Sequence, residues 1–202
     1  MLKNILASIA VLGATVSIAA LGTFATFTSS TAADQASIAT GSVSIALGTP
    51  GPANRLTLGA SGLLPGDTMQ RVVHLSNTGL ADSDDLGSVT LTTSAATSSL
   101  LDTDATNGLK LEIDKCSQAW TESGSSPAFT YTCGGTTSSV LSQRAVVGAD
   151  QTLSNLASLA AGETDYLRVT LTLPASAPNT MQGLSSALTY TFVGTQRTAT
   201  SK

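Results

Sequence analysis

Strict alternation of large apolar residues with polar ones is the feature that most constrains how this chain folds. Its clearest example is residues 109–114, where Leu or Ile alternates with Lys, Glu or Asp. Successive side chains of a strand point to opposite faces of a sheet, so a period of two indicates a strand with one buried face. The same alternation recurs at 43–47, 167–173 and 188–193. The chain is therefore expected to be rich in half-buried strands.

Turn-forming residues separate these segments. Pro-Gly or Asn-x-Gly sequences occur at 49–52, 64–67 and 77–79, and such residues favour tight turns over continued strands. Many short strands with turns of this kind are typical of a sandwich or jelly roll. We predict an all-β domain over residues 49–196, a jelly roll or β-sandwich of about eight to ten strands, with a preceding N-terminal strand at 27–48.

The first residues have the composition of an export signal. Lys3 supplies a positive charge, and residues 5–25 carry none. This pattern predicts a helical signal peptide over residues 1–26 and a secreted or cell-surface protein. The run is also long enough to cross a bilayer, so a retained membrane anchor is the alternative, and membrane contact would then be through the uncleaved leader alone.

Small residues mark the expected cleavage region. Thr23 and Ala25 stand at the spacing that a signal peptidase recognises. A cut near Ala25 or Thr26 would release a mature chain that begins around Phe27.

The two cysteines agree with export. Cys116 and Cys133 are the only cysteines of the chain, and an oxidising compartment favours their pairing. A metal site would need at least one further pair of ligands nearby, which the sequence does not provide. We predict a Cys116–Cys133 disulfide within an insert at about 115–147.

The charge distribution limits the possible partners. The formal net charge is −4, and Lys and Arg form no cluster, whereas binding to phosphate backbones needs clustered cations. We expect no nucleic-acid partner and no cofactor. Residues 197–202 are short and polar, and we expect a disordered tail there.

Several short motifs recur together in one order along nearly the whole chain. Each is a common turn or strand sequence alone, but together they make the chain resemble the TasA/camelysin family of secreted bacterial proteins. Ser29 stands where that family frequently has Asp, and the cysteine-bearing insert has no counterpart that we carry over. The motifs lie at 22–28, 39–45, 64–67, 75–79, 159–163, 173–179, 182–183 and 190–196.

The resemblance implies a jelly-roll fold, export by a dedicated signal peptidase and, as in several members, assembly into extracellular matrix fibres. In such fibres the N-terminal segment of one subunit fills a strand vacancy in the next, which is β-augmentation between chains. Here that segment is residues 27–47, and Val43, Ile45 and Leu47 are expected to set its register. The implied partners are further copies of the chain or related matrix and anchor proteins.

The resemblance also implies a rival activity, because camelysin is the name of a metallopeptidase. A zinc peptidase normally needs two or more His ligands and a Glu base. This chain has one histidine, His74, and no Gly-x-Ser-x-Gly nucleophile motif. We assign no catalytic residue and no metal ligand, and expect a protein that is not an enzyme.

Two further interpretations remain open. Trp120, Phe129 and Tyr131 either form the aromatic contact patch of a non-polymerising adhesin or form the core of a small subdomain. The acidic loops at 82–85 and 102–108 either bind calcium or are solvated turns, and turns are favoured because no closing Glu is present.

Overall fold

The computed structural model describes residues 28–32, 35–36, 45–47, 51–52, 54–56, 58–80 and 84–198. The predictions for the leader lie outside these residues, including Thr23, Ala25, Thr26 and Phe27. The predictions for Val43 and for residues 199–202 of the tail also lie outside the described residues.

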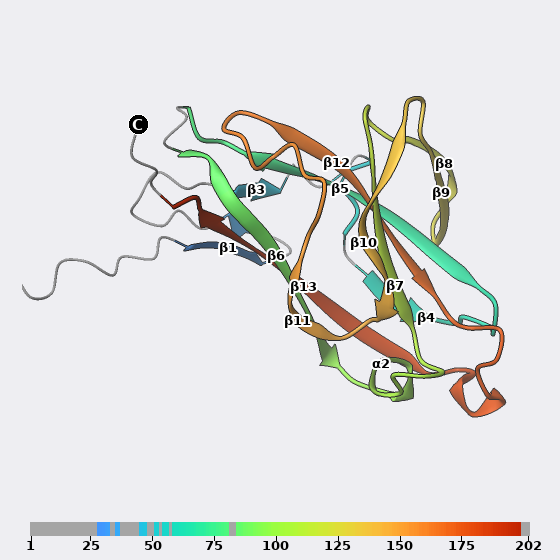
Figure 1. Cartoon of the computed structure of the whole chain (residues 1–202). Helices are drawn as coiled ribbons and strands as arrows, with labels where there is room; N and C mark the ends of the chain where they lie inside the picture. The colour runs from blue at the N-terminus through green and yellow to red at the C-terminus, as the bar shows by residue number, and fades with distance from the viewer. Residues whose placement is uncertain are drawn as a thin grey trace, which may run out of the picture.

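Two antiparallel sheets stack face to face (Figure 1). We name them after their central strands. The β13 sheet has the order β11 (Gly148–Thr152), β6 (Leu86–Thr97), β13 (Ser185–Gln196), β1 (Thr28–Ala32) and β2 (Gln35–Ala36), and β4 (Leu58–Ser61) also pairs with β13. The β12 sheet has the order β10 (Thr137–Ala145), β7 (Lys110–Cys116), β12 (Thr164–Thr172), β5 (Thr68–Asn77) and β3 (Ile45–Leu47).

The described residues also contain a hairpin, a short helix and a 3-10 turn outside the two sheets. The strands β8 (Thr121–Ser125) and β9 (Ala128–Thr132) form a separate hairpin. The short helix α2 (Leu100–Thr103) connects β6 to β7, and the 3-10 turn η2 (Asn179–Met181) precedes β13. Ser99 is the N-cap of α2, and its side chain accepts a hydrogen bond from the Leu101 amide in a capping box.

The connectivity is that of a jelly roll. Eight strands form the quartets β4–β13–β6–β11 and β5–β12–β7–β10, which is the arrangement of two interleaved Greek keys. The predicted all-β jelly roll is confirmed, and ten of the strands among the described residues have five or more residues. Within the predicted insert at 115–147, β10 belongs to the β12 sheet, and the β8–β9 hairpin lies outside both quartets.

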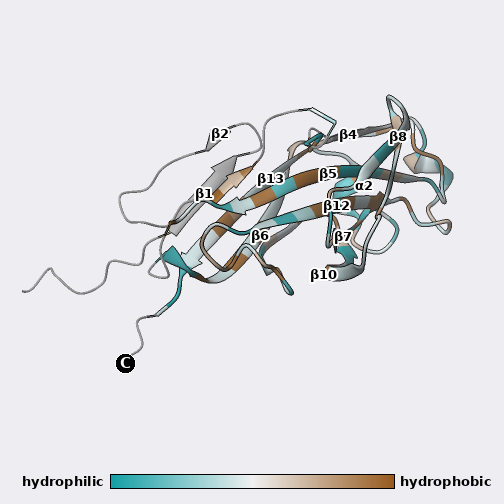
Figure 2. Ribbon diagram, turned by 90° about the horizontal axis from the view of Figure 1, so that it is seen from above, coloured by the Kyte–Doolittle hydropathy of each residue, from teal (hydrophilic) through white to brown (hydrophobic). Residues whose placement is uncertain are grey.

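Alternation places the core between the sheets. In β12, Leu167, Val169 and Leu171 are fully buried, and Leu111 and Ile113 of β7 face them from the neighbouring strand. Hydrophobic and hydrophilic residues alternate along β12 (Figure 2). The core therefore follows from the period-two pattern, because only one face of each strand is covered by the other sheet.

Candidate functional site

The N-terminal strands extend both sheets on one side of the sandwich. β1 pairs with β13 over Thr28–Thr31, and β3 pairs with Leu75–Asn77 of β5. β1 and β3 also lie next to each other. Both are drawn at the same side of the molecule in Figure 1. Residues of the predicted assembly segment thus complete the edges of the chain's own two sheets.

Ile45 is the residue through which β3 enters the core. Its side chain is 2% exposed and reaches from the β12 sheet to Gly194 of β13. A Cβ atom built on Gly194 would lie 2.9 Å from Cγ1 of Ile45 and closer still to its Cδ1. Leu47 is half-buried and packs against the same core. Gly194 therefore forms a hole that Ile45 fills, and any larger residue there would displace it.

Gly194 was not singled out by the sequence analysis, although a signal for it exists. Leu188, Tyr190 and Phe192 occupy the inward positions of β13, and the next inward position holds a glycine. A glycine at a core position of a strand marks a close approach of another group.

The β8–β9 hairpin covers the outer face of the β12 sheet. The side chains of Val72 and Tyr166 point away from the main core, because their neighbours Val73 and Leu167 face it. Trp120 packs on this outer face and its indole Nε1 donates to the Tyr166 carbonyl at 2.9 Å. A second, smaller core is thereby formed beside the jelly roll.

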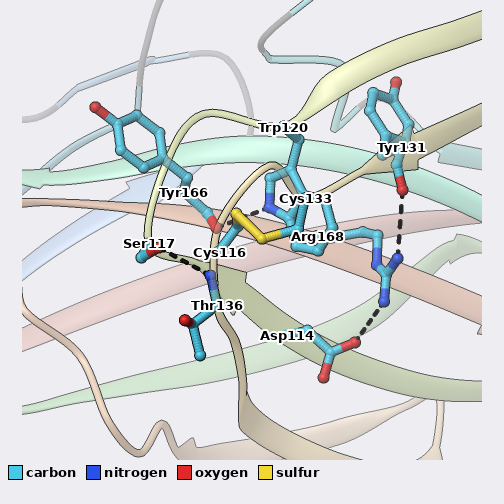
Figure 3. Close-up of a disulfide and its surroundings, with 9 residues drawn as sticks. All are labelled: Asp114, Cys116, Ser117, Trp120, Tyr131, Cys133, Thr136, Tyr166 and Arg168. Carbon is cyan, nitrogen blue, oxygen red and sulfur yellow. Dashed lines mark hydrogen bonds and ion pairs between the residues drawn. A yellow bond between two sulfur atoms is a disulfide. The ribbon is translucent and has the colours of Figure 1, made fainter.

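The predicted disulfide joins this hairpin to the sheet. Cys116 ends β7 and Cys133 follows β9, and the two are bonded, which confirms the pairing (Figure 3). The backbone amide of Thr136 donates to Ser117 Oγ at 3.0 Å beside the bridge. The base of the hairpin is held by both contacts.

Ion pairs fix the hairpin from two sides. Arg55 donates to Glu122 at 2.6 Å, and the Tyr131 hydroxyl donates to the same carboxylate at 2.8 Å. The Arg55 hydrogen bond lowers the pKa of Glu122, while burial raises the pKa of Tyr131 and its hydrogen bond to Glu122 adds to this. Arg168 lies 4.4 Å from the centre of the Trp120 ring and donates to Asp114 at 2.8 Å. Arg55 and Glu122 therefore bind the hairpin to the rest of the domain through an ion pair, and Arg168, itself paired with Asp114, does so through a cation–π contact with Trp120.

The aromatic residues that the sequence analysis grouped do lie together. Trp120 is 9% exposed and Tyr131 is buried, and Phe129 is half-buried beneath the guanidinium groups of Arg55 and Arg71. This geometry is that of a subdomain core and not of an exposed contact patch.

Removal of the disulfide gives a first expected outcome. The Cys116→Ser/Cys133→Ser double variant is expected to lose about 3 kcal/mol of unfolding free energy, because the bridge closes a 17-residue segment. Urea denaturation of native and variant protein measures this loss. Equal stabilities would show that the bridge contributes nothing to the fold.

His74 lies on the outer face of β5, where its ring meets the Tyr166 ring edge-on at 4.7 Å. Its backbone amide donates to Asn54 Oδ1 at 2.7 Å. Among the described residues, no group of three or more His, Cys, Asp or Glu side chains is arranged to hold a metal ion. The structure places His74 as a packed aromatic residue.

Burial lowers the pKa of His74 below its ordinary value of 6.5. As the pH falls through 6.5 the unfolded chain gains a proton that the folded state resists, so stability is lost in the acid direction. We expect the unfolding free energy to fall between about pH 7.5 and 5.5 and the fall to be absent in His74→Gln. The lowered pKa values of Asp102, Asp104 and Glu122 act at more acidic pH. An identical fall in both proteins would contradict this assignment.

The described carboxylates of the two acidic loops accept hydrogen bonds from the chain itself. Asp84 accepts from the Leu80 amide, and Asp85 accepts from the Ala161 amide. Asp102 and Asp104 accept from backbone amides beside α2. These contacts are those of turns and helix caps, which agrees with the turn interpretation. Asp82 lies outside the described residues.

The fold and these contacts define a jelly-roll domain with N-terminal edge strands and a disulfide-bonded hairpin. A family described as camelysin metallo-endopeptidase matches residues 1–201. The chain belongs to this camelysin family, as the sequence resemblance predicted. No curated protein and no solved structure matches the chain. Within the described residues, no helix is long and apolar enough to cross a membrane.

Proposed function

We propose that the protein is a secreted structural component of a cell surface or extracellular matrix, which forms fibres when subunits exchange their N-terminal strands. The observation that carries this proposal is the packing of the buried Ile45 side chain of β3 against Gly194 of β13. A strand that anchors itself by one side chain in a preformed hole can be replaced by the same strand of another copy.

The strength of the pairing supports exchange of this segment. β3 has three register pairs with β5 and β1 has four with β13, whereas β5 and β12 share nine. Short edge strands open at lower free energy than the strands of the sheet interior. The N-terminal strands are therefore the part of the fold that can leave without unfolding the jelly roll.

A structural role also fits the available chemistry better than proteolysis does. The family description names a metallo-endopeptidase, but the chain has one histidine, and that residue packs against Tyr166. A peptidase zinc site takes three protein ligands and a water. The proposal therefore assigns the protein to assembly and not to catalysis.

Electron microscopy tests this function. The chain beginning at Phe27 is expected to form fibres, and the chain beginning at Gly48 is expected to stay as compact particles. A synthetic peptide of residues 27–47 should raise the thermal midpoint of the shortened chain by filling its vacancy, which controls for loss of folding. Compact particles from both chains, or fibres from both, would contradict strand exchange.

A further inference from the structure

A polar groove lies on the side of the sandwich opposite β1 and β3. It has a volume of about 520 Å³ and is lined by β10, the last residue of β11 and the segment that follows β11. β10 and β11 are the outermost strands of their sheets on this side. The lining residues are hydroxyl, amide and aliphatic side chains with one cation, and none is acidic: Ser139, Val140, Leu141, Ser142, Gln143, Arg144, Thr152, Ser154 and Asn155.

Arg144 is the distinctive residue of the groove. Its Nε atom is buried and has no hydrogen-bond partner among the described residues. Four other cations form ion pairs with carboxylates, namely those of Arg55, Lys115, Arg168 and Arg197. A buried guanidinium nitrogen without an acceptor carries a desolvation cost, which an anionic ligand would offset.

The neighbouring strand makes room for this guanidinium. A Cβ atom on Gly148 of β11 would lie 3.2 Å from Nη2 of Arg144. The nearest acidic residue along β11, Asp150, shares hydrogen bonds with Thr92 on the outer face of the β13 sheet. Its carboxylate is therefore directed to that face and does not neutralise Arg144.

The edge of β10 is also shaped for a small ligand and not for an added strand. Its register with β7 shifts between Ser139 and Leu141 and again between Leu141 and Arg144, and such bulges redirect side chains at sheet edges. The Asn155 amide group donates to the Ser139 carbonyl and the Ser154 amide to the Val140 carbonyl. These contacts occupy acceptors that an incoming strand would need.

We propose that this groove binds a carboxylate on a hydroxyl-rich body, the chemistry of a hexuronate unit in an acidic polysaccharide. A planar guanidinium binds a carboxylate through two parallel hydrogen bonds. Hydroxyl and amide groups such as those of Ser142, Ser154 and Gln143 can donate to and accept from sugar hydroxyls. The lining has no aromatic side chain on which a neutral sugar ring would stack.

NMR titration of the ¹⁵N-labelled protein tests the proposal. Glucuronate and a short oligogalacturonate are the probes, with glucose and inorganic phosphate as comparisons. We expect saturable shifts of the amides of Ser139, Arg144 and Asn155 with both uronates, and weaker effects with glucose and phosphate. Saturation by the oligomer alone would support a polysaccharide chain as the source of the carboxylate. Phosphate binding as tight as uronate binding, or no saturable shift at these amides, would overturn the proposal.

Two substitutions at Arg144 distinguish the contribution of its positive charge to uronate binding from that of its two-pronged geometry. Arg144→Gln is expected to weaken uronate binding by at least about tenfold, and Arg144→Lys by less, because lysine keeps the charge but not the two-pronged geometry. Arg197→Gln removes a cation outside the groove and should bind as the native protein does. Thermal midpoints verify folding of each variant. Unchanged binding by folded Arg144→Gln would contradict the site, and the shift map of the native protein tests it even if that variant does not fold.

Discussion

Replacing Trp120 with alanine is expected to lower the unfolding free energy by about 3–5 kcal/mol. The indole fills the small core between the hairpin and the β12 sheet, against Val72, Cys116 and Tyr131. Truncation leaves a cavity there and removes the hydrogen bond to the Tyr166 carbonyl. Urea denaturation followed by far-ultraviolet circular dichroism measures the loss.

Phe129→Ala is the matched control for this prediction. Phe129 belongs to the same hairpin but is half-buried, so its removal should cost less than the removal of Trp120. A Trp120→Ala variant of native stability that has lost binding to a surface would instead support the aromatic contact patch of an adhesin.

Replacing Ile45 with alanine is expected to cost about 2–5 kcal/mol in the monomer and to abolish fibres. The side chain is buried in the main core and lies against Gly194, so its loss empties the hole that fixes β3. The unfolding free energy and electron micrographs of the same preparation give both readouts.

Leu47→Ala is the control for Ile45, since Leu47 belongs to the same strand and is half-buried. It should have a smaller effect on both stability and assembly. Normal fibres from Ile45→Ala would contradict the proposed role of the Gly194 hole.

The period-two pattern was sufficient to predict the main core. Positions such as Leu111, Ile113 and Leu167 were assigned to a buried face from alternation alone, and all three are buried. The pairing of strands was not available from that pattern, because it depends on contacts between residues far apart in sequence. The strand and turn pattern predicts a jelly roll or a β-sandwich, the family resemblance implies the jelly roll, and the quartets of strands confirm it.

The position of the hairpin and the presence of the groove could not be predicted from the sequence. The cysteines predicted a bridge, but nothing local indicated that β10 returns to the β12 sheet directly after the hairpin. Arg144 has no distinguishing sequence context, because its lack of an acceptor depends on how two sheet edges meet. Likewise Arg55 meets Glu122 across 67 residues of chain, a pairing that no local pattern encodes.

The most direct test of strand exchange is a covalent trap between β3 and β5. Ala46 lies opposite Ser76 in the register, so an Ala46→Cys/Ser76→Cys variant can form a bridge wherever this pairing exists. Fibres of this variant are oxidised, dissolved in detergent and separated without reductant, beside fibres of the Ser76→Cys single variant. The account predicts a ladder of covalent multimers from the double variant and none from the single variant. Monomers alone from fibres in which the double variant is fully oxidised would show that each chain keeps its own strand, and would contradict it.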